Sequence, residues 1–106
     1  MAIIADYLTG DEIVALIGQR LRQRRLERNM TVDDLALHTG LNRKTILGLE
    51  TGGDIRLSSL LRILRSLNML GLLESAIPDQ LPAGAAIAAG GQLRRRAHGK
   101  ARAPRG

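Results

Sequence analysis

Helix-start signals follow one another closely in the first half of this chain, and they constrain the fold more than any other feature. Thr9 and Glu12 have the T-x-x-E spacing of a capping box, in which each side chain accepts a hydrogen bond from the other residue's backbone N–H. Thr31 and Asp34 repeat the arrangement with a shorter acid, and Asn42 is a third residue of N-cap type. The spacing predicts three successive helices that begin after residues 9, 31 and 42.

Apolar residues at helical spacing set the extent of these helices. Ile13, Ile17 and Leu21 mark one face of the first helix, which we expect to run to about residue 28. Gly40 is placed to end a short second helix, because glycine adopts the left-handed conformation without strain. The third helix is predicted from Arg43 to about Glu50.

Leucines then predict a fourth helix, and we assign the whole ladder to the core. Its members are Leu57, Leu60, Leu61, Leu64 and Leu67. Leu70, Leu73 and Ile77 outline a fifth helix, which Pro78 stops. One Tyr and no Phe or Trp leave only aliphatic side chains for the core, which favours packed helices over a sheet sandwich. The predicted class is all-α, with five helices.

Composition divides the chain into three parts. Residues 1–8 are an apolar arm, residues 9–78 hold the helices, and residues 79–106 join an Ala/Gly/Pro linker to a basic tail. Ten Lys/Arg and nine Asp/Glu lie in residues 1–78, whereas residues 79–106 hold six basic residues against Asp79 alone. The high isoelectric point therefore belongs mostly to the tail and does not show that the folded part binds nucleic acid.

We predict that the tail is disordered, because it has few apolar anchors and a high net charge. Its arginine cluster is Arg94, Arg95 and Arg96. Two interpretations stay open for this cluster. It either keeps the protein soluble or anchors it nonspecifically to DNA by neutralising phosphates.

Several classes of function are disfavoured by composition. The chain has no Cys, its two His residues are isolated, and no acidic cluster or Gly-rich phosphate loop suggests a metal, a cofactor or catalysis. The scarcity of aromatic residues argues against stacking on single-stranded nucleic acid. No apolar run is long enough for a membrane span, and the N-terminus lacks the features of a signal peptide. A non-enzymatic cytoplasmic protein is the expectation.

Two short helices joined by a glycine-containing turn form a helix-turn-helix. The segment 31–52, "TVDDLALHTGLNRKTILGLETG", resembles the motif of the Xre and phage lambda-type repressors. The shared points are the Thr helix start, Leu35-Ala36, Gly40 at the turn, Ile46, Leu49-Glu50 and Gly52. The resemblance extends over roughly residues 13–77. It implies a five-helix domain that binds double-stranded DNA through the motif at 31–50.

The resemblance also implies which residues contact DNA. The positions that it assigns to DNA contact are Thr31, Asn42, Arg43, Lys44, Leu47 and Thr51, and all but Leu47 also match the family in residue type. In such domains the second helix of the motif lies in the major groove with its N-terminal residues toward the bases. Arg43 then donates to guanine O6 and N7, and Lys44 contacts guanine or phosphate. Asn42 is expected to cap the helix and also to contact phosphate. Thr31 and the loop at Thr51 are likewise expected to contact phosphate.

The resemblance further pairs Arg25 with Glu50 as an ion pair that positions the recognition helix. Three positions depart from the family pattern. Val32 replaces a polar phosphate contact, and Gly48 stands where many members have a polar base-contacting residue. Leu47 replaces another polar side chain. It contacts a thymine methyl, packs internally or meets a protein partner.

The leading hypothesis is a dimeric repressor that binds a pseudo-palindromic operator. The alternative is an antitoxin of the HipB or HigA type, which would regulate its own operon and also bind a toxin protein. A third option keeps the fold and binds only protein. Surplus apolar residues form either a two-fold interface or internal packing: Ile3, Ile4, Leu70, Leu72, Leu73 and Ile77.

Overall fold

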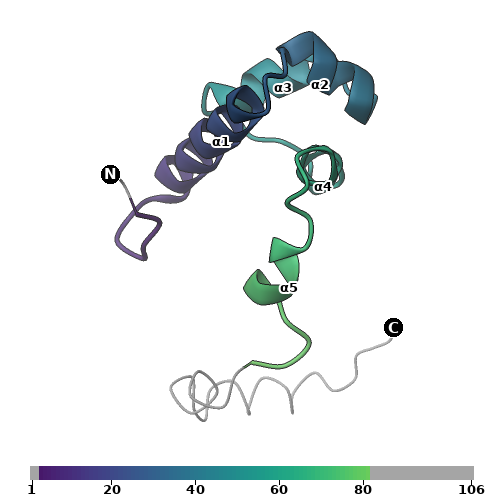
Figure 1. Cartoon of the computed structure of the whole chain (residues 1–106). Helices are drawn as coiled ribbons and strands as arrows, with labels where there is room; N and C mark the ends of the chain where they lie inside the picture. The colour runs from purple at the N-terminus through teal and green to yellow at the C-terminus, as the bar shows by residue number, and fades with distance from the viewer. Residues whose placement is uncertain (1–2, 82–106) are drawn as a thin grey trace. The chain divides into compact units, whose positions relative to one another are not determined.

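A computed structural model describes residues 3–81. Within this range the chain forms five helices and no strand (Figure 1), which confirms the predicted all-α class. The helices are α1 Gly10–Glu27, α2 Val32–Thr39, α3 Arg43–Glu50, α4 Leu57–Ser66 and α5 Leu72–Ala76. The structure divides after Leu72 into two units, and the first of them contains the helix-turn-helix. Arg94, Arg95 and Arg96, and nearly all of the predicted basic tail, lie outside the described residues.

The first three helices begin at the predicted caps. The backbone N–H of Thr9 donates to Glu12 Oε1 at 2.8 Å, and the N–H of Glu12 donates back to Thr9 Oγ1 at 3.1 Å. Thr31 and Asp34 form the same reciprocal pair. The side chain of Asn42 accepts from the N–H of Lys44 at 2.7 Å. Each start is therefore stabilised by side chains within three residues of it.

The capping box of α2 has a measurable pH dependence. The hydrogen bond from the backbone N–H of Thr31 holds the pKa of Asp34 below its ordinary value. The ionised carboxylate therefore stabilises the fold above the unfolded-state pKa of about 3.9, and this contribution is lost as pH falls through the lower folded-state pKa. We expect acidification below about pH 5 to lower the melting temperature of the wild type more than that of Asp34→Asn.

Thermal unfolding followed by circular dichroism between neutral and acidic pH measures this difference. Asp33→Asn is the matched control, because it removes a carboxylate from the same helical turn but leaves the capping box intact. Melting curves of wild type and Asp34→Asn that fall in parallel would show that the box contributes nothing to acid sensitivity.

The core of the first unit is aliphatic. Its buried side chains are Leu21, Leu35, Ile46, Leu49, Ile63 and Leu67. The predicted leucine ladder of α4 is partly wrong, because Leu57 is 70% exposed and Ile63 is buried instead. Successive helical residues turn by about 100°, so Leu57 stands about 120° around the axis from Ile63. Leu67 stands much closer to Ile63 around the axis, and these two form the centre of the buried stripe.

Helix α3 lies between two neighbours. It contacts both α1 and α2, and α2 also contacts α4. At the crossing with α1 the two backbones touch, because a Cβ placed on Gly18 would overlap the carbonyl oxygen of Leu49. The turn between α2 and α3 contains Gly40 in the left-handed conformation, with φ of 76°, as the sequence predicts. The short turn and the close crossing together fix the orientation of α3.

Candidate nucleic-acid interface

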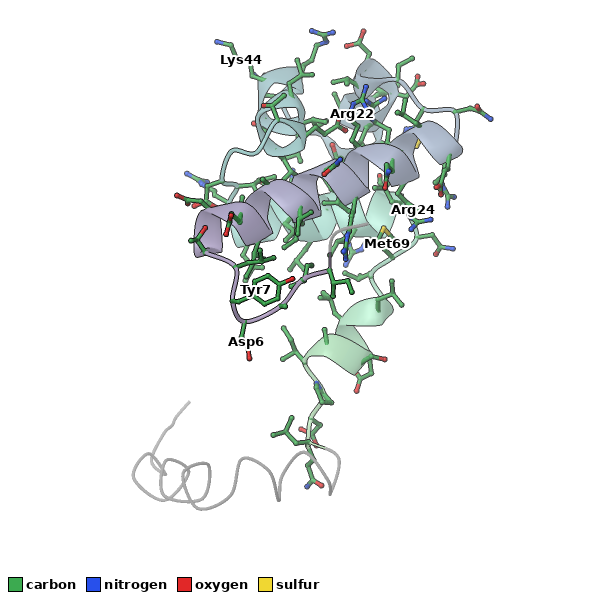
Figure 2. All side chains as sticks on the ribbon, turned by 90° about the vertical axis from the view of Figure 1, so that its left-hand side faces the viewer. Asp6, Tyr7, Arg22, Arg24, Lys44 and Met69 are labelled. Atoms are coloured by element: carbon green, nitrogen blue, oxygen red, sulfur yellow. The ribbon has the colours of Figure 1, made fainter. Side chains whose placement is uncertain are left out.

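The two faces of α3 differ sharply. Ile46 and Leu49 are buried in the core, and Leu41 packs against it just before the helix. Arg43 and Lys44, in the first turn, are exposed. Figure 2 shows Lys44 projecting away from the helices into solvent. The apolar face therefore seats α3 in the domain, and its N-terminal basic residues are presented to whatever lies outside.

The C-terminal end of α3 is tied down by the ion pair that the resemblance implied. Arg25 Nε lies 2.8 Å from Glu50 Oε2, and Arg25 Nη2 donates to Glu50 Oε1 at 2.9 Å. Both side chains are almost fully buried, with 7% and 4% exposed. Arg25 Nη1 also donates to the carbonyl of Met30 at 2.7 Å. One guanidinium thus joins α1, the loop before α2 and α3.

The charge on Arg25 is maintained by its partner. The hydrogen bonds that Arg25 donates to Glu50 raise the pKa of Arg25 above its ordinary value, and the opposite charge of Glu50 adds to this effect. The bidentate geometry satisfies two guanidinium nitrogens with both carboxylate oxygens, and the Met30 carbonyl satisfies the third. The arrangement positions α3 and leaves Arg25 no role at an external ligand.

The first residue of α3 makes a contact that sequence analysis did not predict. Arg43 Nε lies 2.9 Å from Oδ1 of Asp33, in the first turn of α2. Both side chains are exposed, at 59% and 78%. The side chain of Lys44 makes no hydrogen bond or ion pair with any residue in 3–81. The two basic side chains therefore differ in their electrostatic environment, because only Arg43 has a carboxylate beside it.

The remaining polar positions differ in what they offer a ligand. Asn42 uses its carbonyl oxygen to cap α3, so its NH2 group points away from the cap as a donor. The hydroxyl oxygen of Thr31 accepts from Asp34, which leaves its proton available. Both side chains are exposed. Each can donate to a phosphate oxygen without breaking a bond of the fold.

The loop after α3 is more self-contained. The hydroxyl of Thr51 donates back to the carbonyl of Leu47 at 2.8 Å. The N–H of Gly52 donates to Leu49 and the N–H of Gly53 to Gly48. These groups already have partners inside the protein. A contact from Thr51 to phosphate requires its hydroxyl to rotate away from the helix.

The three departures from the family pattern have different environments. Val32 is half-buried and packs against the core, which explains an apolar residue there. Leu47 is half-buried at the surface of α3. A Cβ at Gly48 would meet no atom within 4 Å, so the fold supplies no steric reason for glycine at this position.

A comparison with protein-family models matches residues 20–69 to the Cro/C1-type helix-turn-helix DNA-binding domain. This segment is a Cro/C1-type helix-turn-helix domain. The match confirms the resemblance predicted from residues 31–52, and a domain of this type supports a DNA-binding transcription regulator. It covers the end of α1 and all of α2, α3 and α4, and therefore every position from Arg25 to Thr51 discussed above. The comparison with curated proteins finds no match.

The Cro/C1-type domain has a further surface that sequence analysis missed. An open hollow of about 370 Å³ lies beside α3, and its lining includes Lys44, Gly48, Arg56 and Ser59. Arg56 is the N-cap residue of α4 and makes no side-chain cap bond, so its charge is not used to start the helix. The sequence did contain a signal for Arg56: an arginine stands at an N-cap position, where Ser, Thr, Asp or Asn is usual. The hollow places a second cationic residue near Lys44.

Two exclusions hold for the part of the chain that the structure describes. No group of three or more His, Cys, Asp or Glu side chains is placed to hold a metal ion among residues 3–81. No helix in this range combines the length and the hydrophobicity needed to cross a bilayer.

Proposed function

We propose that this Cro/C1-type domain acts as a dimeric repressor and reads the major groove of its operator with the first turn of α3. The observation that carries the proposal is the pair of exposed basic residues, Arg43 and Lys44, on a helix whose opposite face is buried. Because α3 is also locked at its far end by Arg25 and Glu50, this basic edge is presented on a rigid support.

The proposed roles follow from donor chemistry. Arg43 donates two hydrogen bonds to guanine, whose O6 and N7 accept in the major groove. Lys44 carries an unpaired charge and contacts phosphate or guanine. Asn42 and Thr31 each have a donor free for phosphate oxygens, which would fix the register of the helix on the duplex. Leu47 is available for a thymine methyl group.

A dimer is proposed because one short helix contacts only a few base pairs. The α3 helix spans 8 residues. Two copies would place their recognition helices in half-sites about 34 Å apart, one helical turn of DNA. The first unit exposes apolar side chains that a subunit interface could cover, among them Ile3, Tyr7 and Leu57. Sedimentation of the free protein and of its operator complex measures this stoichiometry.

The DNA-binding edge is tested by removing it. Selection of the full chain against a library of random duplexes gives its preferred operator, and electrophoretic shift then measures affinity for this operator and for a scrambled duplex. We expect the double variant Arg43→Ala/Lys44→Ala to lose about 10-fold to 100-fold in operator affinity, because a good base contact contributes about 1–3 kcal/mol of discrimination. Its affinity for the scrambled duplex should fall far less.

Arg24→Ala is the matched control, because it removes an exposed arginine from α1 outside the recognition helix (Figure 2). This variant should keep the wild-type ratio of operator to scrambled affinity. If the double variant also kept that ratio, the α3 edge would not be the surface that reads DNA.

A further inference from the structure

Resting on the proposed function, we propose that Asp33 is a specificity-determining residue that holds Arg43 as a reader of bases and prevents it from acting as a phosphate clamp. The structural observation is the ion pair across the turn of the motif. Asp33 lies in the first turn of α2 and Arg43 is the first residue of α3, with Oδ1 and Nε 2.9 Å apart.

The atoms used in this pair matter. Asp33 binds Nε, the nitrogen nearest the Arg43 side-chain stem. The two terminal nitrogens, Nη1 and Nη2, have no partner in residues 3–81. Because the guanidinium is planar and its donors are fixed in a fork, holding Nε also fixes the direction of the terminal pair. Two parallel donors at the end of the side chain match the two acceptors of guanine in the major groove.

Charge favours the same assignment. A carboxylate beside Arg43 offsets its positive charge and repels a phosphate that approaches the same point. The neutral edge of a guanine, which offers only lone pairs, does not suffer this repulsion. An exposed ion pair adds little to the stability of the free protein. Its effect is instead to order a long side chain before DNA arrives, which reduces the entropy lost on binding.

Lys44 provides the contrast. It is adjacent in sequence and exposed, and it has no carboxylate partner among the described residues. Arg43 and Lys44 therefore have different roles at DNA. Arg43 supplies base preference with little counterion release, whereas Lys44 supplies electrostatic affinity. Arg43→Ala should leave the slope of log affinity against log salt nearly unchanged, and Lys44→Ala should reduce it by about 0.9.

The decisive experiment compares two carboxylates in one helical turn. Electrophoretic shift measures the affinity of the full chain over a series of salt concentrations. Two duplexes are compared: the selected operator, and the same duplex in which the G·C pair contacted by Arg43 is replaced. We expect Asp33→Asn to lose about tenfold of the preference for the guanine duplex. Its salt slope should rise by up to about 0.9, because the released Arg43 becomes available to a phosphate.

Asp34→Asn is the matched control, because it removes the same charge one residue away, and the Asp34 carboxylate bonds only to the backbone N–H of Thr31 in the capping box. It should gain general affinity from the lost negative charge and keep the wild-type base preference. If both variants changed alike, Asp33 would act only through net charge and the proposal would be wrong. If wild type preferred its operator and Asp33→Asn kept that preference, the proposal would fail while the proposed function stood. A wild type with no preferred duplex would overturn both.

Discussion

Replacing Glu50 by alanine is expected to unfold a large fraction of this protein at room temperature. The substitution removes two of the three acceptors of the Arg25 guanidinium and leaves an unpaired charge on a side chain that is only 7% exposed. Breaking a buried pair by removing one partner costs about 3–5 kcal/mol. The free energy of unfolding of a domain of this size is of the same order, so the substitution removes most of it. Urea unfolding followed by circular dichroism measures the change.

The matched control removes both charges together. Arg25→Met/Glu50→Leu replaces the pair with apolar side chains of similar length, and such exchanges are often neutral or stabilising by about 1–4 kcal/mol. We therefore expect the double variant to be clearly more stable than Glu50→Ala. A Glu50→Ala variant within about 0.5 kcal/mol of wild type would show that the pair behaves like a solvent-exposed one.

Alanine substitutions at two helical glycines are expected to change stability in opposite directions. A Cβ at Gly18 would overlap the carbonyl oxygen of Leu49, so α1 and α3 must separate in Gly18→Ala. Because the obstacle is backbone and cannot rotate away, we expect a loss at or above the usual overpacking cost of about 1–3 kcal/mol. Denaturant midpoints at constant slope measure the loss.

Gly48→Ala is the control for helix propensity. Position 48 is also inside a helix, but a Cβ there meets nothing within 4 Å. Alanine should therefore stabilise the protein by about 1 kcal/mol, the propensity difference between the two residues. The contradicting result is a Gly18→Ala variant stabilised as much as Gly48→Ala, since it would mean that the two helix backbones do not touch.

Much of the candidate site came from the family resemblance and not from spacing. Periodicity alone marked α3 as a helix with one apolar face and one basic edge. Pairing Arg25 with Glu50 required the family pattern, because no local rule connects residues on separate helices. The structure then placed both side chains in contact. The roles assigned to Thr31, Asn42, Arg43, Lys44, Leu47 and Thr51 at DNA remain proposals.

The sequence by itself determined where α1, α2 and α3 start and where α2 ends. Thr9, Thr31 and Asn42 act on backbone groups within three residues, and Gly40 ends α2 through its own φ. Such signals are visible in the sequence because both partners lie in one short segment.

Only the tertiary structure decided which side chains meet across helices. It buried Ile63 and exposed Leu57, brought Gly18 against Leu49, and set Asp33 beside Arg43. Each of these outcomes depends on how closely and at what angle the helices cross. That geometry is fixed by the packing of all the elements together, and no residue spacing within one helix encodes it.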